Sequence, residues 1–369
     1  MSSSRRNRRV LLVTPDFPPA FGGIQRLMYR LAQHLERVET RVVALGGEGV
    51  GAFDRGEALS IVRAPAFGFG GHTAAIGLLN ARTVVEALRF RPHVVLSAHI
   101  FTSPAALAVG RLLGTPYVQY LHGREVIIRP LLTRAGLRGA AAVVAVSSYT
   151  RQLALAHSAV AERIHHIPPG IDLVEPSTTE RSATPTVVTT ARLEQRYKGH
   201  DVLLRALPLV RSRVPNARLV VIGDGPMQPV YENLVRSLAL DGSVEFAGAL
   251  DDASRDHLLD RAHVFAMPSR LPRDGGGEGF GIVYLEAAVH RLPVVAGNVA
   301  GAVDAVVHGE TGLLVDPTDH VAVADALTTL LQSPETAERL GRAAAERAHE
   351  FAWPKIARRV EDVLLEVAR

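Results

Sequence analysis

Two spacings of apolar residues alternate along most of the chain. Short continuous apolar runs predict buried strands, and segments whose apolar residues recur every three or four positions predict helices. The first run, 9–14, ends at Pro15, and the helix after Gly22 and Gly23 carries an apolar stripe of Ile24, Leu27, Met28, Leu31 and Leu35. The same alternation predicts strands at 41–45, 59–63, 93–97, 117–120 and 142–146, with helices at 73–90, 105–113, within 129–137 and after Ser147 or Ser148. Such alternation is typical of a parallel sheet with helices on both faces.

The alternation stops over residues 171–184, which are rich in Ser and Thr and lack apolar periodicity, as a linker does. It then resumes, with strands predicted at 186–190, 219–222, 244–246, 263–267, 294–296 and 313–315, and helices at 201–213, from Pro226, at 321–331, at 335–349 and from Trp353. We therefore expect an α/β protein with domains at 1–170 and 185–350, a linker at 171–184 and a final helical segment at 351–369.

Composition narrows the functional classes. The 369 residues are 47% hydrophobic and enough for two domains, each with its own core. There is no cysteine, which excludes disulfides and thiolate metal sites. No apolar run approaches the length of a membrane span and no signal peptide is visible, so we expect a cytoplasmic protein. Arg5, Arg6, Arg8 and Arg9 suit either an anionic membrane surface or a solvated N-terminus.

The stretch 270–293 combines a glycine-rich loop with a predicted helix. Glu278 lies in the loop, and Glu286 lies eight positions later in the helix. Between them, Phe280, Gly281 and Ile282 place backbone N–H groups at a helix start, which suits an anion. This pattern indicates a nucleotide-sugar pocket, in which amides bind phosphate and carboxylates bind hydroxyls. It equally fits a loop–helix junction whose acids only favour the helix dipole.

Other candidates follow the predicted strands, at whose carboxyl ends parallel sheets bind ligands. Arg192 and Lys198 follow the strand at 186–190 and are either a phosphate clamp or two solvated cations. His122 follows the strand at 117–120 and is either catalytic or structural. Gly22 and Gly23 stand between a strand and a helix, where backbone amides approach phosphates, although the full dinucleotide fingerprint is absent.

Asp251 and Asp252 are adjacent acids of a kind that can suggest a metal site. No histidine or spaced aspartate accompanies them, so carboxylates in the first turn of a helix are the better interpretation. We expect no metal site.

Taken in order and spacing, these motifs resemble the GT-B glycosyltransferases of family four. The resemblance covers essentially the whole chain and rests on Gly22-Gly23, Arg192 with Lys198-Gly199, and the E-x7-E element from Glu278 to Glu286. The segments Pro15-Asp16-Phe17-Pro18-Pro19, Gly22-Gly23-Ile24-Gln25 and 279–287 are similar to bacterial GDP-mannose-dependent mannosyltransferases that act on phosphatidylinositol mannosides.

The resemblance implies two Rossmann-like domains that face a cleft, with the final helix crossing back to the first domain. It implies a retaining, metal-independent transfer of a hexose, with mannose from GDP-mannose expected, to a lipid-linked or glycan hydroxyl. We expect no cofactor and no nucleic-acid partner, and we expect peripheral contact with the inner face of an anionic membrane.

The resemblance also assigns roles to individual residues. Donor-binding groups would be Arg192 and Lys198 on the diphosphate, Glu286 on the ribose, and Gly22, Gly23, Phe280, Gly281 and Ile282 through their backbone. Glu278 would bind the transferred sugar, and His122 would face the sugar and the acceptor.

Two departures and several alternatives remain open. The loop from Arg192 to Lys198 is one residue longer than in some relatives, so Arg196 competes with Arg192, and segment 68–77 offers no acceptor motif. The alternatives are a family-four transferase that uses a UDP-sugar on another acceptor, an epimerase or phosphorylase of this fold, and a non-catalytic nucleotide-sugar-binding protein.

Overall fold

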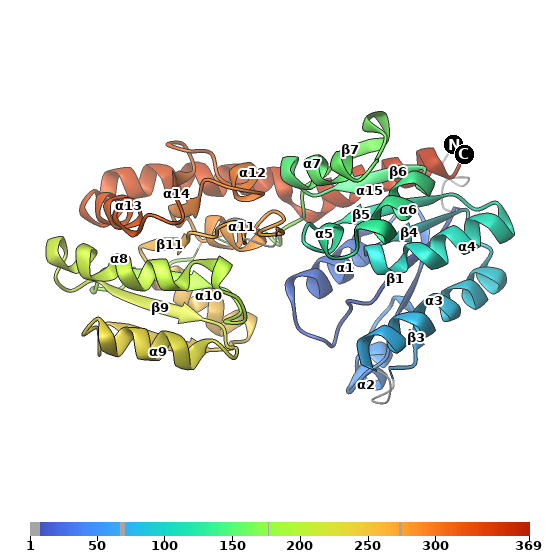
Figure 1. Cartoon of the computed structure of the whole chain (residues 1–369). Coiled ribbons are helices and arrows are strands. Elements are labelled where there is room, and N and C mark those ends of the chain that lie inside the picture. The colour runs from blue at the N-terminus through green and yellow to red at the C-terminus, as the bar shows by residue number, and fades with distance from the viewer. Residues whose placement is uncertain (1–7, 67–70, 176, 273–274) are drawn as a thin grey trace. The chain divides into compact units, whose positions relative to one another are not determined.

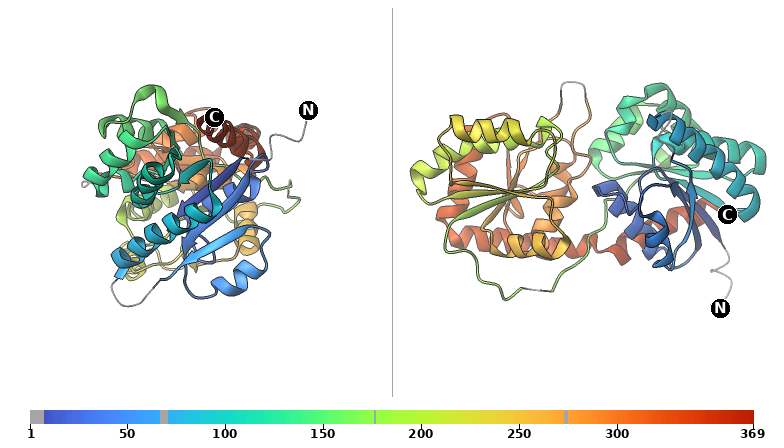
Figure 2. Two further views of the ribbon diagram at one scale, coloured as in Figure 1. Left: turned by 90° about the vertical axis from the view of Figure 1, so that its right-hand side faces the viewer. Right: turned by 90° about the horizontal axis from the view of Figure 1, so that it is seen from below.

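The computed structural model describes residues 8–66, 71–175, 177–272 and 275–369 (Figure 1). The chain divides into two compact units. The first contains Met1–Gly170 and Trp353–Arg369, and the second contains Ile171–Ala352. In each unit a parallel sheet lies between layers of helices (Figure 2). This is the α/β architecture that the alternating pattern predicts.

The sheet of the first unit has the strand order β3-β2-β1-β4-β5-β6-β7 among the described residues. Every strand pair in it is parallel. Its central strands are buried, since helices cover both faces. The strands are β1 (Arg9–Thr14), β2 (Glu39–Leu45), β3 (Ser60–Ala64), β4 (Val94–Ser97), β5 (Tyr117–Leu121), β6 (Ala142–Ala145) and β7 (Ile164–His166).

The described helices of the first unit include one from the far end of the sequence. They are α1 (Gly23–His34), α2 (Val50–Arg55), α3 (Gly71–Phe90), α4 (Ser103–Leu113), α5 (Glu125–Ile128), α6 (Pro130–Gly139), α7 (Ser148–Ala156) and α15 (Trp353–Val367). α15 is anchored to α1 and the turn after it. The Trp353 ring stacks on His34 at 5.9 Å between centroids, and the Arg37 guanidinium lies 2.6 Å from the Asp362 carboxylate.

The second unit repeats this topology. Its parallel sheet has the order β10-β9-β8-β11-β12-β13, with strands β8 (Thr186–Thr190), β9 (Arg218–Ile222), β10 (Val244–Gly248), β11 (Val264–Met267), β12 (Val294–Gly297) and β13 (Gly312–Val315). Its described helices are α8 (His200–Arg213), α9 (Gln228–Ser237), α10 (Asp252–Arg261), α11 (Ile282–Val289), α12 (Ala302–Ala305), α13 (His320–Gln332) and α14 (Pro334–Ala348). Among all the residues described, no helix combines the length and apolar character needed to cross a bilayer.

In the first unit, the apolar spacing does not predict three short elements. β7 carries two histidines in three residues, and α2 and α5 are too short to show a period. Several boundaries also differ by one or two residues, and α9 begins at Gln228 and not at Pro226. The Met227 N–H donates to the Leu193 carbonyl at 2.8 Å, which holds this turn against the loop after β8.

Candidate active site

The strand order of the second sheet reverses between β8 and β11. Although they are far apart in sequence, these strands are neighbours, with Val187 opposite Val264 and Val188 opposite Phe265. Ligands of open α/β sheets bind at such a switch point, beyond the carboxyl ends of the strands. Here the loops at these ends are 191–199 and 268–281, which hold the predicted cations and the first glutamate.

An ion pair joins the two loops. The Lys198 ammonium group contacts the Glu278 carboxylate, and both side chains are mostly buried, at 20% and 16% exposed. Burial alone would lower the pKa of Lys198, but Glu278 and Tyr197 outweigh it and raise the pKa above its usual value. Lys198 is therefore a fixed cation, and its N–H donors are aimed into the loop that carries Glu278.

The start of α11 is shaped by Gly281, whose φ of 91° lies in the left-handed region. A Cβ at this position would also lie 2.3 Å from the Tyr284 ring. The Tyr284 hydroxyl donates to the Met267 carbonyl at 2.8 Å, which fixes the helix to the end of β11. The first backbone N–H groups of a helix have no partner within it, so the backbone at Phe280, Gly281 and Ile282 lies at a helix start, as the sequence predicts. That these amides bind a phosphate stays a prediction.

The backbone of the glycine loop is also held in place. The Glu278 carbonyl accepts a hydrogen bond from the Gly301 N–H at 3.0 Å. The Phe280 ring is buried and lies 5.8 Å from that of Phe351. Of this predicted loop, residues 273 and 274 lie outside the described part of the chain.

Arg192 does not join this ion pair. Its side chain is 66% exposed and donates to the Glu194 carboxylate at 3.1 Å. Arg196, its competitor for the same role, is also exposed. The structure therefore brings Lys198 and Glu278 together and leaves both arginines on the surface of the loop.

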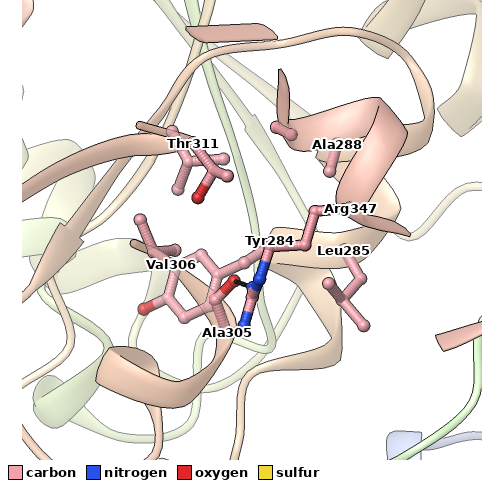
Figure 3. A pocket seen from close by; sticks show the side chains of 9 residues that line it. Tyr284, Leu285, Ala288, Ala305, Val306, Thr311 and Arg347 are labelled. Carbon is pink, nitrogen blue, oxygen red and sulfur yellow. Dashed lines mark hydrogen bonds between the residues drawn. The ribbon is translucent and has the colours of Figure 1, made fainter. Parts of the chain in front are cut away.

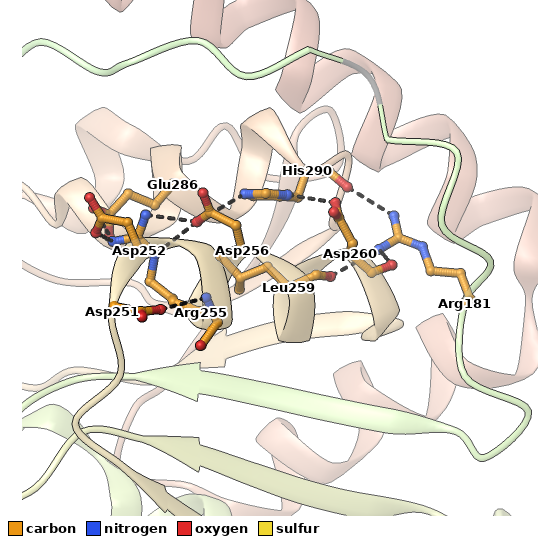
Figure 4. Close-up of polar contacts among 10 residues, drawn as sticks. Arg181, Asp251, Asp252, Arg255, Asp256, Leu259, Asp260, Glu286 and His290 are labelled. Carbon is orange, nitrogen blue, oxygen red and sulfur yellow. Dashed lines mark hydrogen bonds and ion pairs between the residues drawn. The ribbon is translucent and has the colours of Figure 1, made fainter.

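Glu286 projects from α11 toward Arg255, which sequence reasoning missed. The guanidinium Nη1 lies 3.8 Å from the Glu286 Oε1, and the two side chains are 14% and 15% exposed (Figure 4). In sequence, Arg255 follows Asp252 by three positions and resembles an ordinary surface partner on a helix. Only the packing of α10 against α11 brings it to Glu286.

The first of the two adjacent acids caps α10. Asp251 accepts the Ser254 N–H at 2.8 Å, and Asp252 accepts from Arg255 at the same distance. The interpretation as first-turn carboxylates is confirmed. Among the residues described, no group of three or more His, Cys, Asp or Glu side chains is arranged to hold a metal ion.

His122 lies directly after β5 in the first unit. Its Nε2 donates to the Ala98 carbonyl at 2.7 Å, since a carbonyl oxygen can only accept. Its backbone N–H and that of Gly123 donate to the buried Glu125 carboxylate at 2.5 and 3.1 Å. Glu125 thus fixes the loop around His122, and only its place three residues after the histidine could have indicated this.

A second histidine, His99, lies beside His122 at the carboxyl edge of the same sheet. The ring centroids are 6.3 Å apart, and the His99 Nδ1 accepts the Phe101 N–H at 3.2 Å. Burial lowers the pKa of His99, which keeps its ring neutral. The sequence analysis did not single it out.

Gly22 and Gly23 begin α1 at this edge. Gly22 has a φ of 155°, and its carbonyl accepts the Arg26 N–H at 3.1 Å. A Cβ added to Gly23 would meet no atom within 4 Å. Local packing therefore does not demand glycine at position 23, and this end of the helix is open to a ligand.

Two cavities in the second unit lie away from these groups. A small one of about 10 Å³ between α11, α12 and α14 is lined by Tyr284, Ala305 and Arg347 and has room for roughly one water (Figure 3). A larger one of about 370 Å³ is lined by residues of segment 173–181 and of α14. Neither is lined by Lys198, Glu278 or Glu286.

Comparison with known families covers nearly the whole chain. Residues 21–175 match the family model described as Glycosyltransferase Family 4, and residues 172–347 match that described as Glycosyl transferases group 1.

Relatives match over most of their length. A GDP-mannose-dependent alpha-(1-6)-phosphatidylinositol monomannoside mannosyltransferase of Mycobacterium tuberculosis is 35% identical over 96% of this chain and 98% of that protein. A protein of the same description from Mycolicibacterium smegmatis is 33% identical over 90% and 91%. A D-inositol 3-phosphate glycosyltransferase of Pseudarthrobacter chlorophenolicus is 32% identical over 76% and 74%.

Solved structures share the fold at lower identity. Sucrose-phosphate synthase from Thermosynechococcus elongatus superposes with a TM-score of 0.84 at 19% identity, over 98% of this chain and 99% of that one. Anabaena HepE in complex with UDP and glucose gives 0.79 at 19% identity, over 98% and 100%. Together, the two parallel-sheet units, the family models and the full-length relatives show that this chain belongs to the GT-B glycosyltransferases of family four.

Proposed function

We propose that this enzyme transfers mannose from GDP-mannose to a hydroxyl of a phosphatidylinositol mannoside. The observation that carries the proposal is the 35% identity to a mannosyltransferase of that description over 96% of this chain and 98% of that protein. The relative described as acting on D-inositol 3-phosphate covers less of both chains. Both descriptions contain an inositol phosphate, so we expect the acceptor to contain one as well.

The charges at the switch point of the second sheet support a role in leaving-group departure. Breaking a sugar–phosphate bond places negative charge on the diphosphate and positive character on the sugar. Lys198 and the backbone amides before α11 provide fixed positive charge that stabilises the departing diphosphate. Arg192 can turn from Glu194 to join them. Because this cluster supplies the charge stabilisation, the proposed reaction needs no divalent metal and no cofactor.

Glu278 suits the sugar because it is already held beside the phosphate cation. In the free protein it neutralises Lys198. When the donor diphosphate takes over Lys198, the Glu278 carboxylate becomes the acceptor for hydroxyls of the transferred hexose. The Glu286 carboxylate accepts hydrogen bonds from the ribose hydroxyls. We propose retention of the anomeric configuration, with attack on the face from which the diphosphate departs, and a role for His122 beside the sugar.

A lipid acceptor requires access to a membrane, and one surface of the first unit suits it. We define the α5–α6 surface by its exposed side chains, the apolar Ile128 and Leu131 and the basic Arg124, Arg129, Arg134 and Arg138. Over residues 124–139 the one acid, Glu125, is buried under the His122 loop. We propose peripheral contact of this surface with the anionic inner face of the membrane. Of the N-terminal arginines considered for this contact, Arg5 and Arg6 lie outside the described residues.

The acceptor is tested by incubating the purified enzyme with radiolabelled GDP-mannose and one acceptor at a time. Phosphatidylinositol monomannoside in vesicles should gain label in the lipid phase. D-inositol 3-phosphate is the soluble alternative, and label on it would support the second class of relatives. Release of GDP without any labelled acceptor would contradict both assignments.

A further inference from the structure

The side chain of Arg255 is buried to an extent that is rare for an arginine on a surface helix. It comes from the first turn of α10, yet its side chain is only 14% exposed and lies between acids from two helices. Nη1 donates to Asp252 at 2.8 Å, and Nη2 and Nε donate to the same Asp256 oxygen at 2.7 and 3.0 Å. Its guanidinium is thus fixed on its own helix before it meets α11.

The charge of Arg255 is directed at Glu286. Burial on its own would lower the pKa of Arg255, but Glu286 first, and then Asp256 and Asp252, outweigh it and raise the pKa. The 3.8 Å separation between Nη1 and the Glu286 Oε1 is longer than a strong hydrogen bond. At this distance Arg255 attracts the Glu286 carboxylate electrostatically, and a ribose hydroxyl would not have to displace a tight hydrogen bond from Arg255.

Asp256, together with Asp260, also connects α10 to the C-terminal end of α11. Asp256 also lies 3.5 Å from the Nε2 of His290, and the His290 Nδ1 lies 2.7 Å from Asp260 (Figure 4). Arg181, from the segment that enters the second unit, donates to the backbone carbonyls of Asp260 and His290, both at 2.9 Å. A polar seam defined by Arg255, Asp256, His290 and Asp260 therefore runs along the two helices.

We propose that Arg255 is a positioning residue for donor binding, whose guanidinium holds the Glu286 carboxylate in place toward the ribose hydroxyls of the nucleotide. This inference rests on the proposed role of Glu286. Because Asp256 is shared with His290, the seam fixes the rotation of α11 as well as the carboxylate. Arg255 acts through Glu286 and does not itself touch the donor.

The test uses a thermodynamic cycle on nucleoside diphosphate binding. Calorimetry with GDP is performed on the wild type, Arg255→Met, Glu286→Ala and the double variant. We expect Arg255→Met to weaken GDP binding about tenfold, as the loss of one charged interaction does. The double variant should bind like Glu286→Ala alone, because residues that act through one contact are not additive. Additive losses would overturn the proposal.

A ribose-deleted ligand separates positioning from a general structural effect. The 2′,3′-dideoxy form of GDP lacks the hydroxyls that Glu286 would bind, so Arg255→Met should bind it as the wild type does. An equal loss with GDP and its dideoxy form would mean that Arg255 contacts the diphosphate directly or supports the whole pocket, and would contradict the proposal. If UDP binds in place of GDP, the proposed donor is wrong, and the same comparison with UDP and dideoxy-UDP still tests Arg255.

Two further variants are a conservative substitution of Arg255 and a matched control. Arg255→Lys keeps the charge and loses the fork between Asp252 and Asp256, so it should recover part of the affinity, and it serves if Arg255→Met does not fold. Arg213→Met is the matched control, because Arg213 forms an exposed pair with Asp325 at 2.6 Å elsewhere in the same unit. It should leave GDP binding unchanged. In turnover, Arg255→Met should raise the donor KM about tenfold and change kcat little.

Discussion

The Lys198 ammonium group and the Glu278 carboxylate, 80 positions apart in sequence, form an ion pair across the switch point of the second sheet. The pair links the loop after β8 to the glycine loop before α11. It places the cation that we propose for the donor phosphate next to the carboxylate that we propose for the sugar. The predictions for the two glutamates follow from this relationship.

Glu278→Gln and Glu286→Ala should affect different kinetic constants. A carboxylate beside the sugar contributes most when positive character develops there, so Glu278→Gln should lower kcat about ten- to a hundredfold. The ribose changes little during transfer, so Glu286→Ala should mainly raise the donor KM. Steady-state kinetics on both variants, with circular dichroism to check folding, decides the matter. Equal effects on kcat and KM in the two variants would show that the assigned roles are wrong.

His122→Ala should lower kcat about ten- to a hundredfold and leave GDP affinity close to that of the wild type. The reason is its place after β5, in a loop that Glu125 fixes and at an edge where Gly23 is open. His157→Ala is the control, because the His157 ring bonds to the Leu153 carbonyl of its own helix at 2.9 Å. A kcat near the wild-type value in a folded His122→Ala variant would make His122 a structural residue.

His200 predicts an acid-dependent loss of stability. It is buried next to Lys198, and neither ring nitrogen has a hydrogen-bond partner among the described residues. Burial first, and then Lys198, lowers the pKa of His200 from 6.5 to about 4. Between pH 6.5 and 4, the unfolded chain therefore binds a proton at His200 and the folded chain does not. The contribution of His200 to the free energy of unfolding is complete above pH 6.5 and is lost as the pH drops toward 4.

His200→Gln, which stays neutral, tests this effect. The loss attributed to His200 between pH 6.5 and 4 amounts to roughly 3 kcal/mol. Urea unfolding at several pH values should show a flatter decline of the unfolding free energy for the variant, whatever its stability at pH 7. Parallel curves for the two proteins would show that His200 is protonated as readily in the folded state as in the unfolded chain.

The α5–α6 surface should bind anionic vesicles. Leu131 is 79% exposed, and each arginine near such a surface contributes about 1 kcal/mol at low salt. Leu131→Ser combined with Arg134→Ser should reduce cosedimentation with phosphatidylinositol-containing vesicles about tenfold or more, and added salt should weaken the wild type in the same direction. Leu112→Ser removes an exposed leucine from α4 and should change nothing. Equal binding by all three proteins would place the membrane contact elsewhere.

Much of the fold follows from local pattern. β1 and β8 begin and end where their apolar runs predict, because a buried parallel strand needs apolar residues on both faces. Gly281 could be placed at a helix start from sequence alone. Its close approach to Tyr284 depends on a hydroxyl anchored to the end of β11, which no local pattern reveals.

The sequence predicts several residues of the site, but it does not predict which of them contact one another. Lys198 and Glu278 were each identified from their loops, but their pairing depends on β8 and β11 being neighbours. Arg255 carries no local signal, since the contact that makes it important is made to another helix. Arg192 was predicted to act with Lys198, and in the free protein it pairs with Glu194. Its place in the clamp remains a prediction about the donor complex.

The most direct test of the central claim is donor preference during transfer. Purified enzyme is given phosphatidylinositol monomannoside vesicles, excess EDTA and either GDP-mannose, UDP-glucose or UDP-N-acetylglucosamine, and the lipid product is analysed by mass and by NMR of the new anomeric centre. We predict a hexose added from GDP-mannose alone, in the α configuration of the donor and at an undiminished rate in EDTA. Preferential transfer from a uridine donor, or no transfer until magnesium or manganese is restored, would contradict the account.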